Sequence, residues 1–454
     1  MNKFLLLFDK SKFLFLTIFN ILLLMFLIPT RSFAGIIIKN GNSFNSSFNQ
    51  ANIAWLLASS ALVLLMTPAL GFFYGGMVRK KNVLNTISLS FITICTVSII
   101  WVLLGYSLAF GPDALHIIGN LKYIGLNAMK IAQHSRYASS VPSYVFVIFQ
   151  LMFAIITVAL VSGSLVERIK FSSWIIFSIV WLLLVYIPVA HSVWGIGGFF
   201  KNLGVLDWAG GIVVHLTAGL GGLAGALVLG KRRGYLKENI IQPNQLGYTI
   251  LGAGMLWFGW FGFNAGSALA ANMYAASAFL TTNTAAAAAA ISWMIIESLH
   301  SGKPTTLGIV SGAVAGLAAI TPAAGFVGPL SAIIIGLVAG AICYFMIIIV
   351  KNRLGYDDSL DVFNVHGAAG VWGALATGLF ASPFINPKYS GLFFGNPRQF
   401  LIQLITVICV GVYAFIMSFV IFKIIDKIFG LRATQDSEGI GLDVTQHNEV
   451  GYNL

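Results

Sequence analysis

Long apolar runs separated by short polar segments fill this chain from about residue 52 to residue 428. Each run is close to the ~20 residues that an α-helix needs to cross the hydrocarbon core of a bilayer. The runs do not alternate apolar and polar positions, so we exclude membrane-spanning strands. We predict eleven transmembrane helices, at 52–75, 85–110, 141–163, 173–191, 208–230, 246–268, 274–299, 305–321, 327–350, 362–382 and 398–428.

The composition supports an all-α polytopic membrane protein. Of the 454 residues, 58% are hydrophobic and only 9% are charged, and the mean hydropathy is +0.89. The 48 glycines fit close packing between membrane helices. The net charge of +12 does not indicate nucleic-acid binding, because the lysines and arginines lie in short loops rather than on one basic face. The three cysteines fall inside apolar runs without metal-ligand spacing, so we expect no metal site.

The basic residues predict the orientation of the chain. Fifteen lysines and arginines fall in one set of loops and the C-terminal region, and seven fall in the opposite loops. The positive-inside rule therefore places the mature N-terminus, near residue 35, outside the cell and the C-terminus in the cytoplasm. The expected location is the inner or plasma membrane. An odd number of spans agrees with this orientation.

The two ends of the chain are predicted to be distinct from the membrane domain at 35–428. Residues 1–34 combine lysines, an apolar run and small residues at Ser32 and Ala34, which predicts a signal peptide, with an uncleaved anchor helix as the alternative. Residues 429–454 are polar and are predicted to form a cytoplasmic tail. The tail is either a disordered end or a docked regulatory segment.

Two histidines lie inside predicted spans. His215 and His366 occupy the same place in the pattern Val-His-x-x-Ala-Gly-x-x-Gly, at 214–222 and 365–373. Ionisable residues in membrane spans are rare and usually functional, and matching frames indicate one site built from two related halves. The alternatives are two separate histidines bonded to backbone carbonyls, or a haem held by both rings, which a Soret band would reveal.

Aromatic residues and a hydroxyl indicate a second type of site. Phe149 and Phe153 share one helix face, and Ser267 follows Phe263 by four residues in an aromatic run. Trp194 lies near the outer end of its span. Aromatic faces and a hydroxyl acceptor can together hold a small cation, although aromatic residues in membrane helices mostly serve packing.

The acidic residues are predicted to have structural roles. Asp207 begins a span and is expected to cap that helix. Asp357, Asp358 and Asp361 precede the second histidine span and are expected to act as caps or cytoplasmic-face residues. Glu167 and Arg168 are predicted to form a local ion pair. No phosphate-binding glycine motif, arginine-rich span or chain of mid-membrane carboxylates is present, which excludes ATP-driven pumping and disfavours voltage sensing and carboxylate-based antiport.

Several stretches resemble the ammonium transporter family, which includes methylammonium permeases and Rhesus proteins. The resembling stretches are GFFYGGMVRKKNVL (71–84), LVERIKFSSW (165–174), YIPVAHSVWG (186–195), LDWAGGIVVH (206–215), WFGFNAGSA (260–268), TPAAGFVGP (321–329) and DDSLDVFNVHGAAG (357–370). The resemblance implies eleven transmembrane helices with an inverted five-plus-five repeat, a final long helix, and a homotrimer with one pore in each subunit.

The resemblance also implies roles for individual residues. It implies an outer recruitment site formed by Phe149, Phe153, Trp194 and Ser267, a gate of Phe153 and Phe263, a pore and proton relay of His215 and His366, and structural support from Asp207, Trp260, Thr321 and Asp361. It implies a transporter rather than an enzyme, with no cofactor and no metal. The expected partners are ammonium or ammonia, methylammonium as an analogue, membrane lipid, and a PII-type signalling protein at the cytoplasmic face.

The function expected from the sequence is ammonium transport through a hydrophobic pore, with deprotonation of the cation and separate passage of the proton. A passive ammonia channel is one alternative. An ammonium sensor is the other, although no output domain follows residue 429.

Overall fold

The computed structural model describes residues 48–235 and 243–452, and the predicted signal peptide at 1–34 lies outside these ranges. Within them, nine helical segments are long and apolar enough to cross a membrane. Helices of the first half are α2 (Gln50–Met77), α3 (Val83–Ile100) continued by η2 (Trp101–Gly105) and α4 (Tyr106–Phe110), α5 (Ser143–Val161), α6 (Phe171–Trp181) continued by η5 (Leu182–Tyr186) and α7 (Ile187–Trp194), and η6 (Gly211–Leu216) continued by α9 (Thr217–Leu229). Helices of the second half are α10 (Leu246–Gly266), α11 (Met273–Ser301), α12 (Thr306–Ile320), α13 (Pro329–Phe345) continued by η7 (Met346–Lys351) and α14 (Asn352–Leu354), and η8 (Phe363–Gly367) continued by α15 (Ala368–Phe380), and these are followed by α16 (Pro397–Phe429).

Two of the eleven predicted spans correspond to helices that do not meet the length and hydropathy expected of a simple span. Helix α12 has 15 residues, and at 1.5 Å per residue it is only about 22 Å long. The segment formed by η8 and α15 changes helix type part of the way along and contains the polar residues Asn364 and His366. Both predicted helices are therefore present, whereas only nine helical segments of the described residues have both the length and the hydropathy of a simple span.

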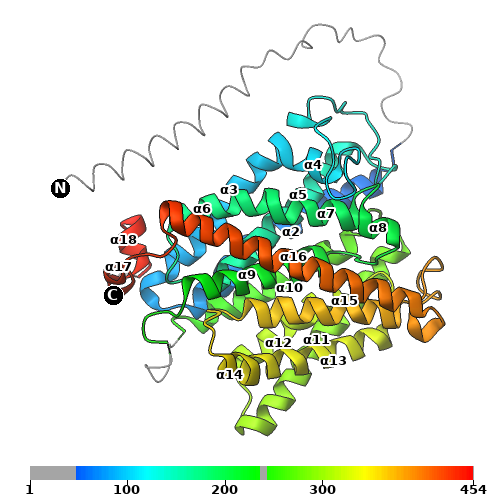
Figure 1. Ribbon diagram of the computed structural model, residues 1–454. Coiled ribbons are helices and arrows are strands. Elements are labelled where there is room, and N and C mark those ends of the chain that lie inside the picture. Colours follow the sequence, from blue (N-terminus) through cyan, green and yellow to red (C-terminus); the bar gives the residue numbers. More distant parts are fainter. Residues whose placement is uncertain (1–47, 236–242, 453–454) are drawn as a thin grey trace. The chain divides into compact units, whose positions relative to one another are not determined.

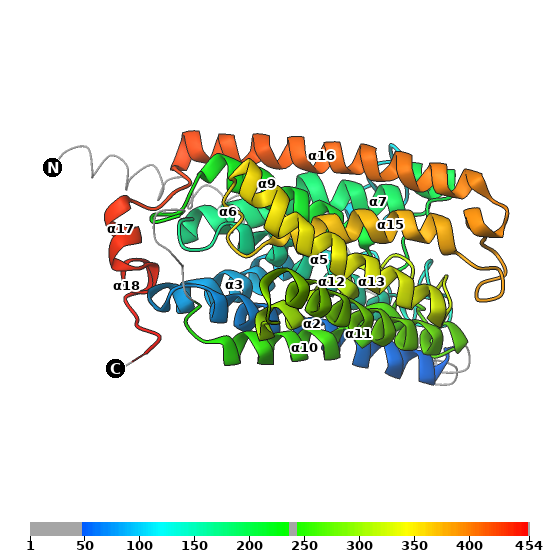
Figure 2. The ribbon, with the colours of Figure 1, turned by 90° about the horizontal axis from the view of Figure 1, so that it is seen from below.

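Small residues let the two histidine-bearing helices cross closely. A Cβ atom added at Gly219 in α9 would lie 2.3 Å from the Cα atom of Gly367 in η8, which is closer than van der Waals contact allows. Glycine is therefore required at this crossing, as is typical of close helix pairs in membranes. The long helix α16 packs along α9 and α15, and Figures 1 and 2 show it beside both helices.

The described part of the C-terminal tail is docked rather than disordered, and its regulatory role stays a prediction. Helices α17 (Gln435–Ile440) and α18 (Leu442–His447) lie near the beginning of α3 (Figure 2). The Asp443 carboxylate accepts hydrogen bonds from the backbone N–H groups of Leu84 and Asn85 at 3.1 and 2.8 Å. The tail thus caps α3 with a negative charge at its positive end.

Candidate functional site

An aromatic cavity lies where the ends of α4, α5, α7 and α10 meet. Its volume is about 160 Å³. The residues that line it are Phe110, Tyr137, Phe146, Phe149, Gln150, Phe153, Trp194, Lys201, Trp208, Ser267 and Leu269. The cavity therefore brings together the four residues that the sequence indicated for cation recruitment.

The hydroxyl and the rings are held in fixed positions in this cavity. The Trp194 indole N–H donates to the backbone carbonyl of Asp207 at 2.8 Å, which fixes the ring at the cavity wall. The Ser267 hydroxyl donates to the Phe263 carbonyl at 2.8 Å, and its oxygen keeps lone pairs that can accept from a bound cation. The rings of Phe149 and Phe153 lie 5.0 Å apart, centre to centre. This arrangement offers a hydroxyl acceptor and aromatic faces to a small cation.

Two phenylalanine rings separate the cavity from the histidines. Phe153 in α5 and Phe263 in α10 are stacked, with ring centres 4.2 Å apart and planes 28° apart. Both side chains are buried. Phe153 also meets the Trp194 ring edge to face at 6.0 Å, and Phe263 lies 6.1 Å from the His215 ring. Phe153 and Phe263 therefore lie between Trp194 and His215 in a series of ring contacts.

His215 and His366 lie side by side in the interior. Their ring centres are 5.3 Å apart and their planes differ by 13°. Both side chains are buried. Within the described part of the chain, neither ring nitrogen of His215 has a hydrogen-bond partner, and nor does Nδ1 of His366. This contradicts the alternative in which each histidine bonds separately to a carbonyl, since neither nitrogen of His215 makes such a bond.

Each histidine sits in a π-helical turn at the start of its helix. His215 lies in η6 and His366 lies in η8. π-Helical turns are rare and occur often at functional sites, because the wider turn reorients side chains and frees backbone groups. The repeated sequence frame thus corresponds to a repeated local structure.

Asp207 caps the first histidine helix, as predicted. One carboxylate oxygen accepts from the N–H groups of Gly210 and Gly211 at 3.0 and 2.6 Å. The other accepts from Ile212 and Val213, both at 3.0 Å. Burial raises the pKa of Asp207 to about 6, while the four N–H donors act in the opposite direction. A single carboxylate therefore satisfies the free donors that begin the helix carrying His215.

Asp358 is the counterpart of Asp207 in the second half, and of the three aspartates that the sequence offered as caps it is the one whose carboxylate bonds to a backbone N–H at the start of η8. Its buried carboxylate accepts from the Phe363 N–H at 2.8 Å, at the start of η8. The signal was available, because Asp358 precedes His366 by the same number of positions as Asp207 precedes His215. Burial, followed by the charge of Asp361, raises the pKa of Asp358.

The remaining predicted support residues hold neighbouring parts of the site. The Trp260 indole lies 5.3 Å from the His215 ring and donates to the Thr321 hydroxyl at 2.9 Å. The Asp361 carboxylate accepts from the Lys351 ammonium at 2.7 Å and from the Asn364 amide at 3.0 Å. Asp361 thus lies at the end of η8 remote from the aromatic cavity and does not contact the histidine pair.

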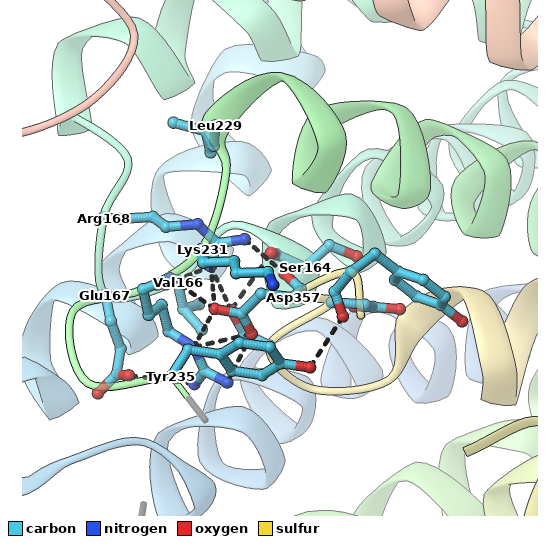
Figure 3. Close-up of polar contacts among 12 residues, drawn as sticks. Ser164, Val166, Glu167, Arg168, Leu229, Lys231, Tyr235 and Asp357 are labelled. Carbon is cyan, nitrogen blue, oxygen red and sulfur yellow. Dashed lines mark hydrogen bonds and ion pairs between the residues drawn. The ribbon is translucent and has the colours of Figure 1, made fainter. Parts of the chain in front are cut away.

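A buried charged cluster lies at that same end of the helices, and it corrects one prediction (Figure 3). Glu167 does not pair with Arg168, because the backbone at Glu167 has a φ of +69° and the two side chains diverge. Glu167 instead pairs with Arg79 at 2.9 Å and with Arg232 at 3.1 Å. Arg168 donates to the Asp357 carbonyl at 2.6 Å, and Arg232 contacts the Asp357 carboxylate at 2.9 Å.

The pKa values of this cluster show how its charges depend on one another. Burial alone would raise the pKa of Glu167, but Arg232 and Arg79 lower it below its ordinary value of 4.5. Burial lowers the pKa of Arg168 to about 10, despite the nearby Asp357. The cluster links four segments, at 78–82, 165–170, 230–235 and 355–362, to one another through ion pairs.

Glu167→Gln is expected to lower the melting temperature of the purified protein by several degrees. The change removes the charge that faces two arginines, and hydrogen bonds to charged groups contribute roughly 1.5–3 kcal/mol. Because the pKa of Glu167 is lowered on folding, its contribution is complete above pH 4.5 and is lost as the pH falls through the lower folded value. Melting curves of parent and variant should therefore differ at pH 7 and converge in acid. A difference that does not depend on pH would contradict this account.

Comparisons with known proteins agree with this arrangement of helices and rings. The family model described as "Ammonium Transporter Family" matches residues 54–452. The ammonium transporter of Aquifex aeolicus is 48% identical over 429 residues, which cover 93% of this chain and 99% of that relative. The ammonium transporter of Bacillus subtilis is 49% identical over 392 residues, which cover 86% of this chain and 96% of that relative.

A solved structure extends the likeness from sequence to fold. The crystal structure of Saccharomyces cerevisiae Mep2 is similar with a TM-score of 0.81 at 35% identity, covering 87% of this chain and 91% of that chain. The likeness confirms an all-helical, multi-pass membrane fold. It also removes the support for a haem carrier, which rested on the histidine pair alone. The protein is thus a transporter rather than an enzyme, and the chain belongs to the ammonium transporter family.

Proposed function

We propose that this chain binds ammonium in the aromatic cavity, deprotonates it, and conducts ammonia past the two histidines while the proton moves separately. One observation carries the proposal. An unbroken series of ring contacts leads from Trp194 through Phe153 and Phe263 to His215 and His366. The series begins in a cavity suited to a cation and ends at unpartnered imidazole nitrogens in the interior.

The chemistry must distinguish ammonium from potassium, which has a similar size. Both ions lose hydration on entering an apolar pore, and a buried ion without partners is costly. Ammonium can donate hydrogen bonds to the Ser267 hydroxyl and can lose a proton, whereas potassium can do neither. Past Phe153 and Phe263, an apolar environment disfavours the charged form of the amine, so ammonia is favoured there.

The histidine pair supplies the polar groups beyond the gate. A neutral imidazole has one donor and one acceptor, so two neighbouring rings can accept hydrogen bonds from ammonia and pass a proton between them. The 5.3 Å separation of the ring centres supports an exchange between His215 and His366. If the proton crosses the membrane, transport is driven by the membrane potential, at ~2.3 kcal/mol per charge per 100 mV.

The first test is a current recording from purified protein in proteoliposomes. We expect an ammonium pulse to give a transient current and a potassium pulse of equal concentration to give none, because only ammonium can release a proton. Protein-free liposomes are the control. An equal response to potassium would contradict the proposed selectivity.

If neither ion gives a current, a second measurement follows. A pH dye inside the liposomes would then report alkalinisation if neutral ammonia enters alone, which is the passive-channel alternative. The absence of both a current and an alkalinisation would contradict transport itself.

We extend the proposal to the architecture and surroundings of the chain. Counting α12 and the segment of η8 and α15 as short spans gives eleven helices, with an inverted five-plus-five repeat that relates η6 to η8 and with α16 as the last helix. In this proposal residues 1–34 are a signal peptide, the aromatic cavity faces outward, and residues 429–454 lie in the cytoplasm. The family resemblance further implies a homotrimer and a PII-type partner at the cytoplasmic face.

A further inference from the structure

A lysine side chain reaches into the mouth of the aromatic cavity. Lys201 lies in the short helix α8 (Phe199–Leu203) and is one of the residues that line the cavity. Its Nζ atom donates to the Trp194 carbonyl at 2.6 Å and lies 5.6 Å from the centre of the Tyr137 ring. The Tyr137 ring in turn stacks on Phe146 at 4.8 Å.

These contacts are the ones that a recruited ammonium ion would make. The head group of lysine is itself an alkylammonium with three N–H donors and no acceptor. It is held by a carbonyl oxygen and by the face of an aromatic ring, as cations are held in aromatic sites. Lys201 therefore places a tethered ammonium group of the chain at the entrance to the cavity.

The charge of Lys201 is not offset within the cavity. None of the residues that line the cavity is acidic. The nearest carboxylate along the chain, that of Asp207, is occupied by four backbone N–H groups. Like charges repel more strongly in a partly desolvated site than in bulk water, so a second cation in the cavity meets the field of Lys201.

We propose that Lys201 sets the affinity of the outer cation site: its ammonium group weakens binding of the substrate cation in the aromatic cavity by like-charge repulsion and by competing for the same wall. This inference rests on the proposed function of the cavity as the outer cation site. It predicts that the chain gives up affinity for the cation in exchange for faster release, since a more weakly bound ion leaves the cavity more readily toward the gate.

The test is an ammonium titration of the transient current in proteoliposomes. Lys201→Met is expected to lower the half-saturating ammonium concentration about tenfold, which corresponds to about 1.4 kcal/mol of binding free energy. Lys201→Gln should also lower the half-saturating concentration, and it replaces the methionine variant in the test if that variant does not fold. Lys201→Arg keeps the charge and is expected to give no such fall.

The matched control is Lys122→Met. Lys122 also places its ammonium over a tyrosine ring, that of Tyr123 at 5.8 Å, but it does not line the cavity. Its replacement removes one positive charge without changing the mouth of the cavity, so the half-saturating concentration should stay within about twofold of the parent, a factor worth only about 0.4 kcal/mol. A purely structural role for Lys201 would lower the maximal current of the variants and leave half-saturation unchanged.

The outcomes separate the inference from the proposed function. A parent protein that gives neither current nor alkalinisation contradicts the proposed function. A parent that transports, combined with an unchanged or raised half-saturating concentration in Lys201→Met and Lys201→Gln, overturns the role of Lys201 alone. An equal fall in Lys201→Arg or Lys122→Met would also overturn it, because charge at this position would not be the cause.

Discussion

The double variant His215→Ala with His366→Ala is expected to reduce the ammonium-specific current at least about 100-fold, a loss of about 2.7 kcal/mol. The two imidazoles lie side by side in the interior, and His215 is otherwise bordered by the rings of Trp260 and Phe263. The double variant removes the two imidazoles that we propose as proton acceptor and polar partner for ammonia beyond Phe153 and Phe263. Transient currents in proteoliposomes, recorded with ammonium and with potassium, measure both the loss and any change in selectivity.

The single variants and a control histidine sharpen this test. Each single replacement should cost nearly as much as the double replacement, because residues that act as one unit are not additive. His300→Ala is the matched control, since His300 also lies in a membrane helix but bonds to the Tyr344 hydroxyl at 2.7 Å, away from the pair. If the double variant kept the current and the selectivity of the parent, the proposed relay through the two histidines would be contradicted.

The parts of the site that could be predicted are those encoded by local pattern. Apolar run length identified the helices, because a bilayer imposes a nearly constant length on each span. The repeated frame around His215 and His366 predicted that the two rings would meet, and they lie 5.3 Å apart. The cap formed by Asp207 was predictable as well, because a cap acts on residues close by in sequence.

The errors and omissions concern contacts between residues distant in sequence. Adjacency suggested a pair of Glu167 with Arg168, yet a left-handed backbone at Glu167 directs its carboxylate to Arg79 and Arg232. In the sequence, Lys201 is only one of the seven basic residues of the opposite loops. Its place at the cavity mouth depends on how α8 folds back toward Trp194 and Tyr137, and hydrophobic periodicity carries no information on that.

The variant Asp207→Ala is expected to cause the largest loss of stability of any single change considered. The Asp207 carboxylate accepts hydrogen bonds from four buried backbone N–H groups, those of residues 210–213. Alanine would leave these donors without a partner, at about 1–3 kcal/mol for each one left unsatisfied. We expect the melting temperature in detergent to fall by roughly 10 °C or more, and transport to fall with it, because the same turn positions His215.

Two further variants separate the loss of the buried cap from the general cost of losing any cap. Asn272→Ala removes a cap from α11 that accepts two backbone N–H groups at 3.0 and 3.1 Å at an exposed position, so its expected cost is only about 1 kcal/mol. Asp207→Asn keeps one acceptor oxygen and replaces the other with a donor that opposes the N–H groups it faces. Its melting temperature should therefore lie between those of the parent and Asp207→Ala. If Asp207→Ala melted no lower than Asn272→Ala, the four hydrogen bonds would not be what holds the start of this helix, and the position of His215 would have to be fixed instead by its packing against Trp260 and Phe263.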